Sequence, residues 1–267
     1  MHVTKKVISN LNKCYAMSEV TVEGKHCFVV AAEKHDPCYL FSEEGELLEK
    51  VWDEPGGVMT MAPVPGADGQ FLATHKFYSP NDSADAKIVI VTRRGKGDWE
   101  ARTLCEAPFV HRFGIFRRAG VNYLLVCCLK SGHSYKNDWR FAGACFAAEL
   151  PDDLSEFNDG HLLELSLVQD GMLRNHGFSR AVWGGHEAAV IGCEQGGHGP
   201  RQTHLDRWLA QGNQVLHRDH MERGSRRLPR GDLRFQYRYG KCYAFRQKRR
   251  QGDRCRHKPR DRRSCLL

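Results

Sequence analysis

The segment GKHCFVVAAEK, at residues 24–34, contains the pattern that decides the fold: a glycine, an apolar triplet, a small residue and then a charged or amide pair. The pattern recurs, with small departures in the last two copies, as GADGQFLATHK (66–76), GVNYLLVCCLK (120–130) and GHEAAVIGCEQ (185–195). The four glycines are 42, 54 and 65 residues apart. Recurrence at such intervals is typical of an array of supersecondary units.

Each copy is expected to be the first hairpin of a four-stranded unit. A strand-like run precedes each glycine and the apolar triplet follows it, so the glycine falls where a hairpin turn needs a positive φ. Two more strand-like runs then follow, and four short antiparallel strands per repeat are typical of a propeller blade. The sequence therefore predicts an all-β, incomplete β-propeller of about four blades, beginning near residues 15, 57, 109 and 175.

Other fold classes fit the pattern less well. An ordinary β-sandwich or meander also has strands at regular intervals, but it gives no reason for the same small residue to follow the same glycine four times. A doubly wound α/β fold is not expected, because no 10–15-residue segment between strands has a sustained helical period. The best helical candidate is one turn at residues 152–157, capped by an aspartate.

The charge and the aliphatic content change abruptly near residue 197. Residues 1–197 contain 20 Lys+Arg against 26 Asp+Glu, a net charge of −6, whereas residues 198–267 contain 20 against 6, a net charge of +14. The second segment has one valine and no isoleucine, so it cannot bury enough apolar surface to offset the entropy of ordering. We expect a partial propeller over 1–197 and a largely disordered, Arg-rich tail over 198–267.

Three interpretations of the tail are open. It is a natural basic arm that binds nucleic acid non-specifically through phosphates, a solvated extension without a role, or the product of a reading-frame shift in a gene that encoded the rest of the propeller. The third is favoured, because the change interrupts the fourth blade where two more strands are due, and half a blade leaves unpaired strand edges.

The cysteine content indicates a reducing compartment. The chain has 11 cysteines, and those before residue 197 form no C-x-x-C pair, so they are expected to be free thiols in a cytoplasmic protein. Cys242, Cys255 and Cys265 have no spacing typical of a structural zinc site. No apolar stretch suits a signal peptide or a membrane span, so no membrane partner is expected.

The candidate catalytic residues come from equivalent positions of the repeat. Counting back nine residues from each turn glycine gives Tyr15, Gly57, His111 and His176. First strands of propeller blades line a central channel, whose mouth is the default ligand site. His111 and His176 could therefore act as acid and base or bind a divalent metal there. The alternative is that each histidine only fixes the turn at the start of its blade.

A second polar set follows the second strand of each blade and continues into the loop 130–140. This loop is longer than a hairpin needs and combines cations, a histidine and aromatic side chains, which is typical of a binding loop on a rigid scaffold. Tyr135 and Trp139 could stack on a sugar or a base, although a solvated loop with tucked aromatics is equally compatible. The candidate ligand-binding residues are His75, Lys76, Lys130, His133, Lys136, Trp139, Arg140 and Glu194.

The blades, especially the segment NHGF at 175–178 leading to AVIGCE at 189–194, resemble those of bacterial FG-GAP/VCBS-repeat propellers. The resemblance covers roughly residues 14–197 and implies a sugar-directed enzyme or a scaffold module. The calcium loop common in such families is approached only by residues 81–85, which lack its alternation and its glycine.

Three functions are therefore considered. The first is a protein or enzyme that binds a small molecule, such as a sugar or sugar acid, at the channel mouth. The second is a non-catalytic interaction or scaffold module that binds a protein or glycan. The third is a non-functional truncated product whose tail binds nucleic acid adventitiously.

The tail interpretation can be tested directly. If residues 198–267 are a frame-shifted remnant, trypsin should digest them rapidly at their 17 arginines, and any binding to DNA should be salt-sensitive and indifferent to sequence. Limited proteolysis followed by mass spectrometry would check the first point, and binding at two salt concentrations the second. A protease-resistant fragment covering 198–267 would contradict the remnant interpretation.

Overall fold

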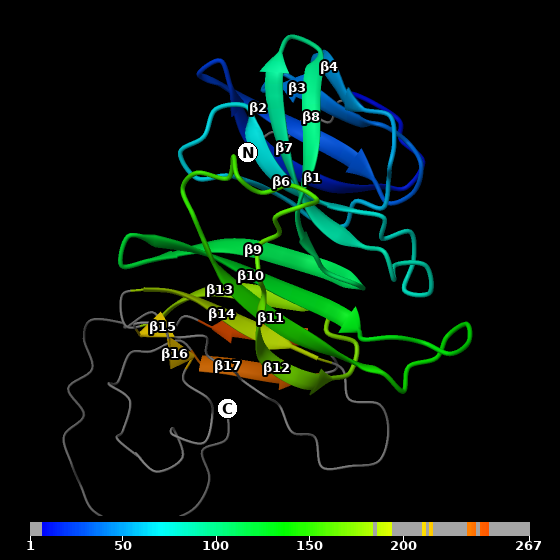
Figure 1. Ribbon diagram of the computed structural model, residues 1–267, viewed down its shortest axis with the longest axis vertical. Coiled ribbons are helices and arrows are strands. Elements are labelled where there is room, and N and C mark those ends of the chain that lie inside the picture. The colour runs from blue at the N-terminus through cyan, green and yellow to red at the C-terminus, as the bar shows by residue number, and fades with distance from the viewer. Residues whose placement is uncertain are drawn as a thin grey trace, which may run out of the picture. The chain divides into compact units, whose positions relative to one another are not determined.

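The computed structural model describes residues 7–183 and 186–193, together with four short strands in the C-terminal part of the chain (Figure 1). Every helix or strand among the described residues is a β-strand. The described part therefore contains no helix that is long and apolar enough to cross a membrane. The chain divides into two compact units, Met1–Arg223 and Gly224–Leu267.

The part of the first unit before residue 194 contains three four-stranded antiparallel sheets and one two-stranded sheet, each with its strands in sequence order. The first sheet consists of β1 (Cys14–Val22), β2 (Lys25–Ala32), β3 (Cys38–Ser42) and β4 (Leu47–Trp52). The second consists of β5 (Met61–Pro63), β6 (Gln70–His75), β7 (Lys87–Gly95) and β8 (Asp98–Glu106). The third consists of β9 (Val110–Arg118), β10 (Val121–Lys130), β11 (Ala142–Leu150) and β12 (Ser166–Met172). The two-stranded sheet consists of β13 (Gly177–Trp183) and β14 (His186–Gly192).

These sheets are the blades of an incomplete propeller, as the repeat predicts. Their first strands contact one another in order, β1 with β5, β5 with β9 and β9 with β13. The first unit also contains the short pair β15 (Ala210–Gln211) and β16 (Gln214–Val215), and the second unit contains the hairpin of β17 (Arg234–Arg238) and β18 (Lys241–Phe245). The rest of the predicted disordered tail lies outside the described residues.

The turn glycines fall between the first two strands of their blades. Gly24 and Gly120 are each the second residue of a two-residue turn and have φ of 71° and 85°. Gly66 also has positive φ (78°), but it lies in a longer connection between β5 and β6. The repeat is therefore confirmed for these three glycines, while Gly185 lies outside the described residues, between β13 and β14.

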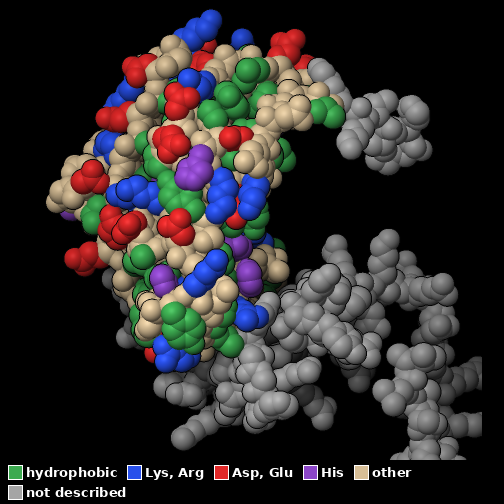
Figure 2. Space-filling view, turned by 90° about the vertical axis from the view of Figure 1, so that its right-hand side faces the viewer, with side chains coloured by type: hydrophobic (Ala, Val, Ile, Leu, Met, Phe, Trp, Pro, Cys, Tyr) green, Lys and Arg blue, Asp and Glu red, His purple; other side chains and the backbone are tan. Residues whose placement is uncertain are grey.

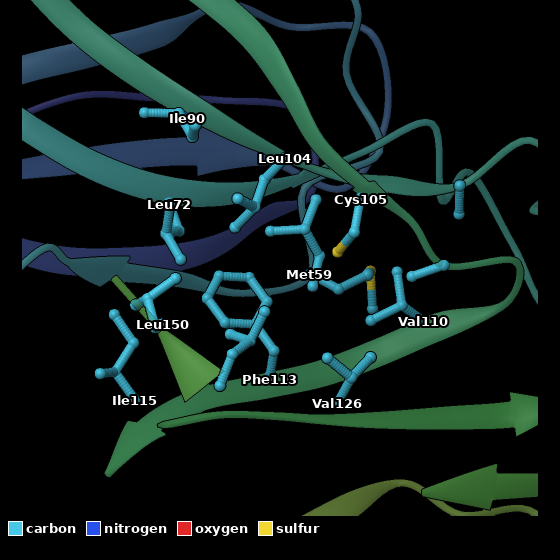
Figure 3. Close-up of a cluster of buried hydrophobic side chains, with 14 of the residues drawn as sticks. Met59, Leu72, Ile90, Leu104, Cys105, Val110, Phe113, Ile115, Val126 and Leu150 are labelled. Atoms are coloured by element: carbon cyan, nitrogen blue, oxygen red, sulfur yellow. The ribbon is translucent and has the colours of Figure 1, made fainter. Parts of the chain in front are cut away.

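Apolar side chains fill the spaces between neighbouring blades. The cluster between the second and third blades includes Met59, Leu72, Leu104 and Phe113, which face one another from the two sheets (Figure 3). Similar clusters join the first blade to the second and the third to the fourth. Each fully buried Leu or Phe contributes roughly 1.5–3 kcal/mol, so packing between blades is the main source of stability.

One buried ion pair joins the outer strands of the first two blades. Arg93 Nη2 of β7 lies 2.8 Å from Glu49 Oε1 of β4, and Trp99 Nε1 donates to the other oxygen of Glu49 at 2.8 Å. Both charged side chains are at least nine-tenths buried. Removing Arg93 would leave the buried Glu49 carboxylate without its counter-charge, so this pair fixes how the two blades meet.

Each blade is entered through a residue with a left-handed backbone. These residues are Lys13 (φ 56°), Gly57 (77°), Phe109 (61°) and Arg174 (50°). Three of the four are not glycine and therefore carry backbone strain. No glycine marks these three positions, so sequence reasoning missed this feature of the repeat.

The carbonyl of the entry residue accepts a hydrogen bond from a backbone N–H at the end of the second strand or within two residues after it. This bond ties the end of the first hairpin to the beginning of its own blade in all three four-stranded blades. The bonds run from Glu33 to Lys13 (2.9 Å), from Phe77 to Gly57 (3.1 Å) and from Leu129 to Phe109 (3.0 Å).

This bonding pattern corrects the register of the second blade. Gly57 is equivalent to Lys13 and Phe109, not to Tyr15 and His111, because the longer β5–β6 connection displaces the count by two residues. The equivalent of Tyr15 and His111 is therefore Met59, which is buried in the core.

The helical turn expected at residues 152–157 is absent. Asp153 accepts the backbone N–H of Ser155 at 2.8 Å, which makes a local turn around the aspartate. Arg102 then donates to the carbonyls of Ser155 and Phe157, both at 2.7 Å, and holds the segment against the second blade. The helix prediction was wrong because the aspartate and these contacts offer the backbone other partners.

The eight described cysteines are free thiols, as expected. Six of them are buried. Cys127 and Cys145 lie opposite each other on β10 and β11, with their sulfurs 3.9 Å apart.

Two glycine substitutions test the entry geometry. A Cβ on Gly57 would lie 2.2 Å from the backbone nitrogen of Phe77 and would be held at positive φ, so Gly57→Ala should lower the free energy of unfolding by about 2–4 kcal/mol. Gly24 has positive φ but open space around it, so Gly24→Ala should cost about 1 kcal/mol. Urea unfolding of both variants gives the comparison, and equal losses would contradict the assigned role of Gly57.

Candidate functional site

The two predicted catalytic histidines meet where the third and fourth blades begin. His111 lies on β9, and His176 immediately precedes β13. Their ring centroids are 5.0 Å apart and the rings are nearly perpendicular (89°). The equivalent positions of the repeat therefore bring these side chains together, as their shared register predicts.

The hydrogen bonding of His111 determines its protonation. Its Nδ1 lies 3.0 Å from the backbone oxygen of His176, and a carbonyl oxygen can only accept, so Nδ1 carries the proton. Burial lowers the pKa of His111 to about 4, which keeps the ring neutral at physiological pH. Nε2 therefore has an unshared electron pair, and no described residue forms a hydrogen bond with it.

Two aromatic rings surround His111. Tyr15, from the start of the first blade, lies 6.3 Å away and Phe77 lies 5.5 Å away, both edge-to-face. Tyr15 is 46% exposed, whereas His111 is 8% exposed. Phe77 was missed by sequence reasoning, because only the entry bond to Gly57 brings it to this position.

The hydroxyl groups of Thr74 and Thr60 connect the second blade to the histidine pair. Thr74 Oγ1 accepts the backbone N–H groups of Met59 and Thr60 at 2.6 and 3.1 Å. Thr60 Oγ1 in turn donates to the backbone oxygen of His111 at 3.1 Å. The backbone of His111 is therefore held from the second blade and its ring from the fourth.

Lys130 is a buried structural cation and not an open ligand contact. Its side chain is fully buried, and its Nζ lies over the rings of Trp139 (4.8 Å) and Phe109 (5.6 Å). Nζ also donates to Asn81 Oδ1 at 3.2 Å. Burial lowers the pKa of Lys130, and the π-electrons of the rings help to stabilise its charge.

Trp139 connects the 130–140 loop to the entry of the fourth blade. The guanidinium of Arg174 lies 4.8 Å from the Trp139 ring centroid, the same distance as Lys130 Nζ. Arg174 is the left-handed entry residue two positions before His176. The loop therefore contacts the entry residue of the fourth blade, although Trp139 and Lys130 are used in internal contacts.

Arg140 is held by a buried carboxylate. Its Nε and Nη2 donate to the two oxygens of Asp138 at 2.9 and 2.8 Å, and Asp138 also accepts the backbone N–H of Ser134. The Arg140 guanidinium keeps the pKa of Asp138 well below its usual range. The exposed guanidinium lies 5.3 Å from the ring of Tyr135 and 5.8 Å from that of Phe141, both of which are exposed.

The remaining candidate ligand-binding residues differ in burial and do not form one site. His75 is 3% exposed and packs edge-to-face on Trp52 at 4.9 Å, which places it in the core between the first two blades. His133 is exposed and contacts the ring of Phe109 at 5.9 Å. Lys136 is exposed and Lys76 half-buried, and Glu194 lies outside the described residues.

Basic side chains of several types lie close together on one face of the molecule, where Figure 2 shows histidines beside Lys and Arg side chains.

Among the described residues, no group of three or more His, Cys, Asp or Glu could hold a metal ion. The segment 81–85 is committed to internal bonds as well, since Asn81 Oδ1 accepts from Lys130 and from the backbone of Asn137.

Comparison with known proteins gives distant structural neighbours. No protein-family model and no curated protein matches the sequence, so the FG-GAP/VCBS resemblance stays a prediction. The PQQ-bound aldose sugar dehydrogenase of Streptomyces coelicolor is 14% identical, with a TM-score of 0.44 over 72% of this chain and 63% of that one. The soluble aldose sugar dehydrogenase of Escherichia coli is 13% identical, with a TM-score of 0.42 over 74% and 65%. A Synechocystis apocarotenoid oxygenase is 15% identical, with a TM-score of 0.37 over 58% and 38%.

The chain thus spans less than two thirds of the length of each of these neighbours.

Stability should depend on the buried histidines between pH 6.5 and 5. Burial lowers the pKa of His75 to about 3, so below pH 6.5 the unfolded chain binds a proton that the native protein excludes. This stabilising contribution is complete above pH 6.5 and is lost as the pH falls. Proton binding at His75 in the unfolded chain alone should lower the free energy of unfolding by about 2 kcal/mol at pH 5.

Urea unfolding of wild type and His75→Gln at pH 7 and pH 5 measures this effect. The variant should lose about 2 kcal/mol less than wild type over that interval. His26→Gln is the control for removal of a histidine at an exposed position. An unchanged pH dependence in His75→Gln would show that His75 titrates normally in the native state.

Proposed function

We propose that the first unit binds a small hydroxylated molecule, of the sugar or sugar-acid class, beside His111, His176 and Tyr15. The observation that carries this proposal is the meeting of side chains from equivalent positions of three blades. His111 lies within 6.3 Å of both other rings, measured between centroids. If these residues at the starts of their blades only fixed their own turns, their side chains would have no reason to converge.

The chemistry of these groups suits a sugar. The exposed ring of Tyr15 offers an apolar face to C–H groups, and the unprotonated Nε2 of His111 can accept a hydrogen bond from a hydroxyl. The exposed His176 supplies a second polar group next to it. An apolar wall with a few fixed polar groups is the usual composition of a small-molecule site.

The same groups favour binding over acid–base chemistry. An efficient general base or acid has a pKa near the working pH, whereas burial lowers that of His111 to about 4. His111 is therefore better suited to hold a hydroxyl in place than to remove its proton.

A second candidate function is a non-catalytic interaction module, supported by the exposed part of the 130–140 loop. Tyr135 is 59% exposed and Phe141 39%, and both flank the guanidinium of Arg140. Aromatic residues and arginine are enriched in binding hot spots. Because Asp138 already holds Arg140, the patch would lose little entropy on binding a protein or glycan.

A double substitution tests the proposed site. D-Glucose and D-gluconate, titrated into the ¹⁵N-labelled protein, should shift resonances of Tyr15 and its neighbours. In His111→Ala/His176→Ala the affinity should fall at least tenfold, because the hydroxyl acceptor is removed. The loss corresponds to about 1.4 kcal/mol, the order of one hydrogen bond.

Tyr135→Ala is the matched control, since it alters the exposed loop but not the histidine pair. It should leave the sugar affinity unchanged. If the histidine variant unfolds at lower urea but binds as well as wild type, the histidines are structural. If only Tyr135→Ala loses binding, the loop is the site and the interaction module is the better interpretation.

A further inference from the structure

Asn175 is a fully buried side chain at the entry to the fourth blade, directly before His176. Its Nδ2 donates to the backbone oxygen of Ala144 on β11 at 3.1 Å. Its Oδ1 accepts the backbone N–H of Gly177 at 3.2 Å. One amide group thus closes a turn around His176 and attaches that turn to the third blade.

The turn determines where the carbonyl of His176 points. This carbonyl accepts the hydrogen bond from His111 Nδ1, and it belongs to the residue that the Asn175–Gly177 bond encloses. Gly177 has φ of 143°, and a Cβ there would lie 2.9 Å from the Cβ of Arg112. The backbone therefore passes close to β9, and no larger residue fits at position 177 without a shift.

We propose that Asn175 is a positioning residue that fixes His111 in the Nδ1–H tautomer. In a neutral imidazole the hydrogen bond of one nitrogen decides which nitrogen carries the proton. Asn175 holds the acceptor in place, so Nδ1 donates to it and Nε2 is left as an acceptor.

The consequence for ligand choice rests on the proposed function. A site that presents an acceptor requires a donor from the ligand, so a hydroxyl group is bound at Nε2 and its methyl ether is not. Buried polar groups left unpaired cost enough to make such selection effective. Asn175 would then determine specificity without contacting the ligand.

NMR of the full chain labelled with ¹⁵N-histidine, at a pH where His111 is neutral, tests the tautomer. The protonated nitrogen is identified by its upfield ¹⁵N shift and its couplings to the ring protons. Wild type should show His111 protonated at Nδ1. In Asn175→Ala a measurable share of His111 should change to the Nε2–H form.

Asn122→Ala is the matched control. Asn122 is also buried in the third blade and donates to Asp152 at 3.1 Å, but it does not contact the histidine pair. It should leave the tautomer of His111 unchanged. If Asn175→Ala does not fold, Asn175→Ser replaces it, because a serine hydroxyl closes such turns more weakly and should give an intermediate share of the Nε2–H form.

An Nε2–H tautomer in wild type, or an unchanged tautomer in the folded Asn175 variant, would overturn the role of Asn175. Failure of D-glucose and D-gluconate to bind wild type, with the tautomer results as expected, would instead overturn the proposed function and leave the positioning role intact. The two hypotheses thus fail through different measurements.

Discussion

The hydrogen bond that closes each blade entry is the constraint on which the rest of the structure depends. The carbonyl of a left-handed residue accepts a backbone N–H at or just after the end of the second strand, in each of the first three blades. It brings the end of one hairpin to the start of the same blade. Phe77 reaches His111 through this bond, and Lys130 is positioned under Phe109 because Leu129 bonds to it. The strain of three non-glycine entry residues, about 1–3 kcal/mol each, is offset by packing between the blades.

Polar contacts then pass from blade to blade along these entries. Thr60 donates to the carbonyl of His111, and His111 donates to the carbonyl of His176. In each bond the acceptor is a backbone oxygen of the next blade. A shift of one blade entry would therefore shift the hydrogen bond to the entry of the next blade. This coupling gives the histidine pair a structural role. The two interpretations of His111 that the sequence leaves open are therefore not exclusive: Nδ1 holds a turn, and Nε2 remains free of bonds to described residues.

Much of this arrangement could be predicted from the repeat, and the rest depended on contacts that a repeat does not encode. The spacing of Gly24 and Gly120 predicts their hairpins, and the shared register predicts that His111 and His176 converge. Counting back nine residues from the turn glycine failed in the second blade and gave Gly57. The β5–β6 connection is longer there, so Gly66 is displaced from the centre of the turn. In the sequence Lys130 resembles an exposed cation at the start of a loop. In the structure it is buried by contacts with Trp139 and Asn81. The segment 152–157 likewise forms no helical turn, because distant Arg102 binds its carbonyls.

The distribution of charge around the site limits the ligands that it can select. Lys130 is buried under Trp139, and Nε and Nη2 of Arg140 donate to Asp138, so these two candidate ligand-binding cations are already engaged within the protein. His111 is uncharged near neutral pH because burial lowers its pKa to about 4. What the meeting point of the blades offers is therefore shape and directed hydrogen bonding more than fixed charge. Fixed hydrogen-bonding groups reject ligands that leave them unpaired, whereas fixed charge attracts many anions alike. The proposed site would therefore select hydroxyl groups, which sugars and sugar acids share.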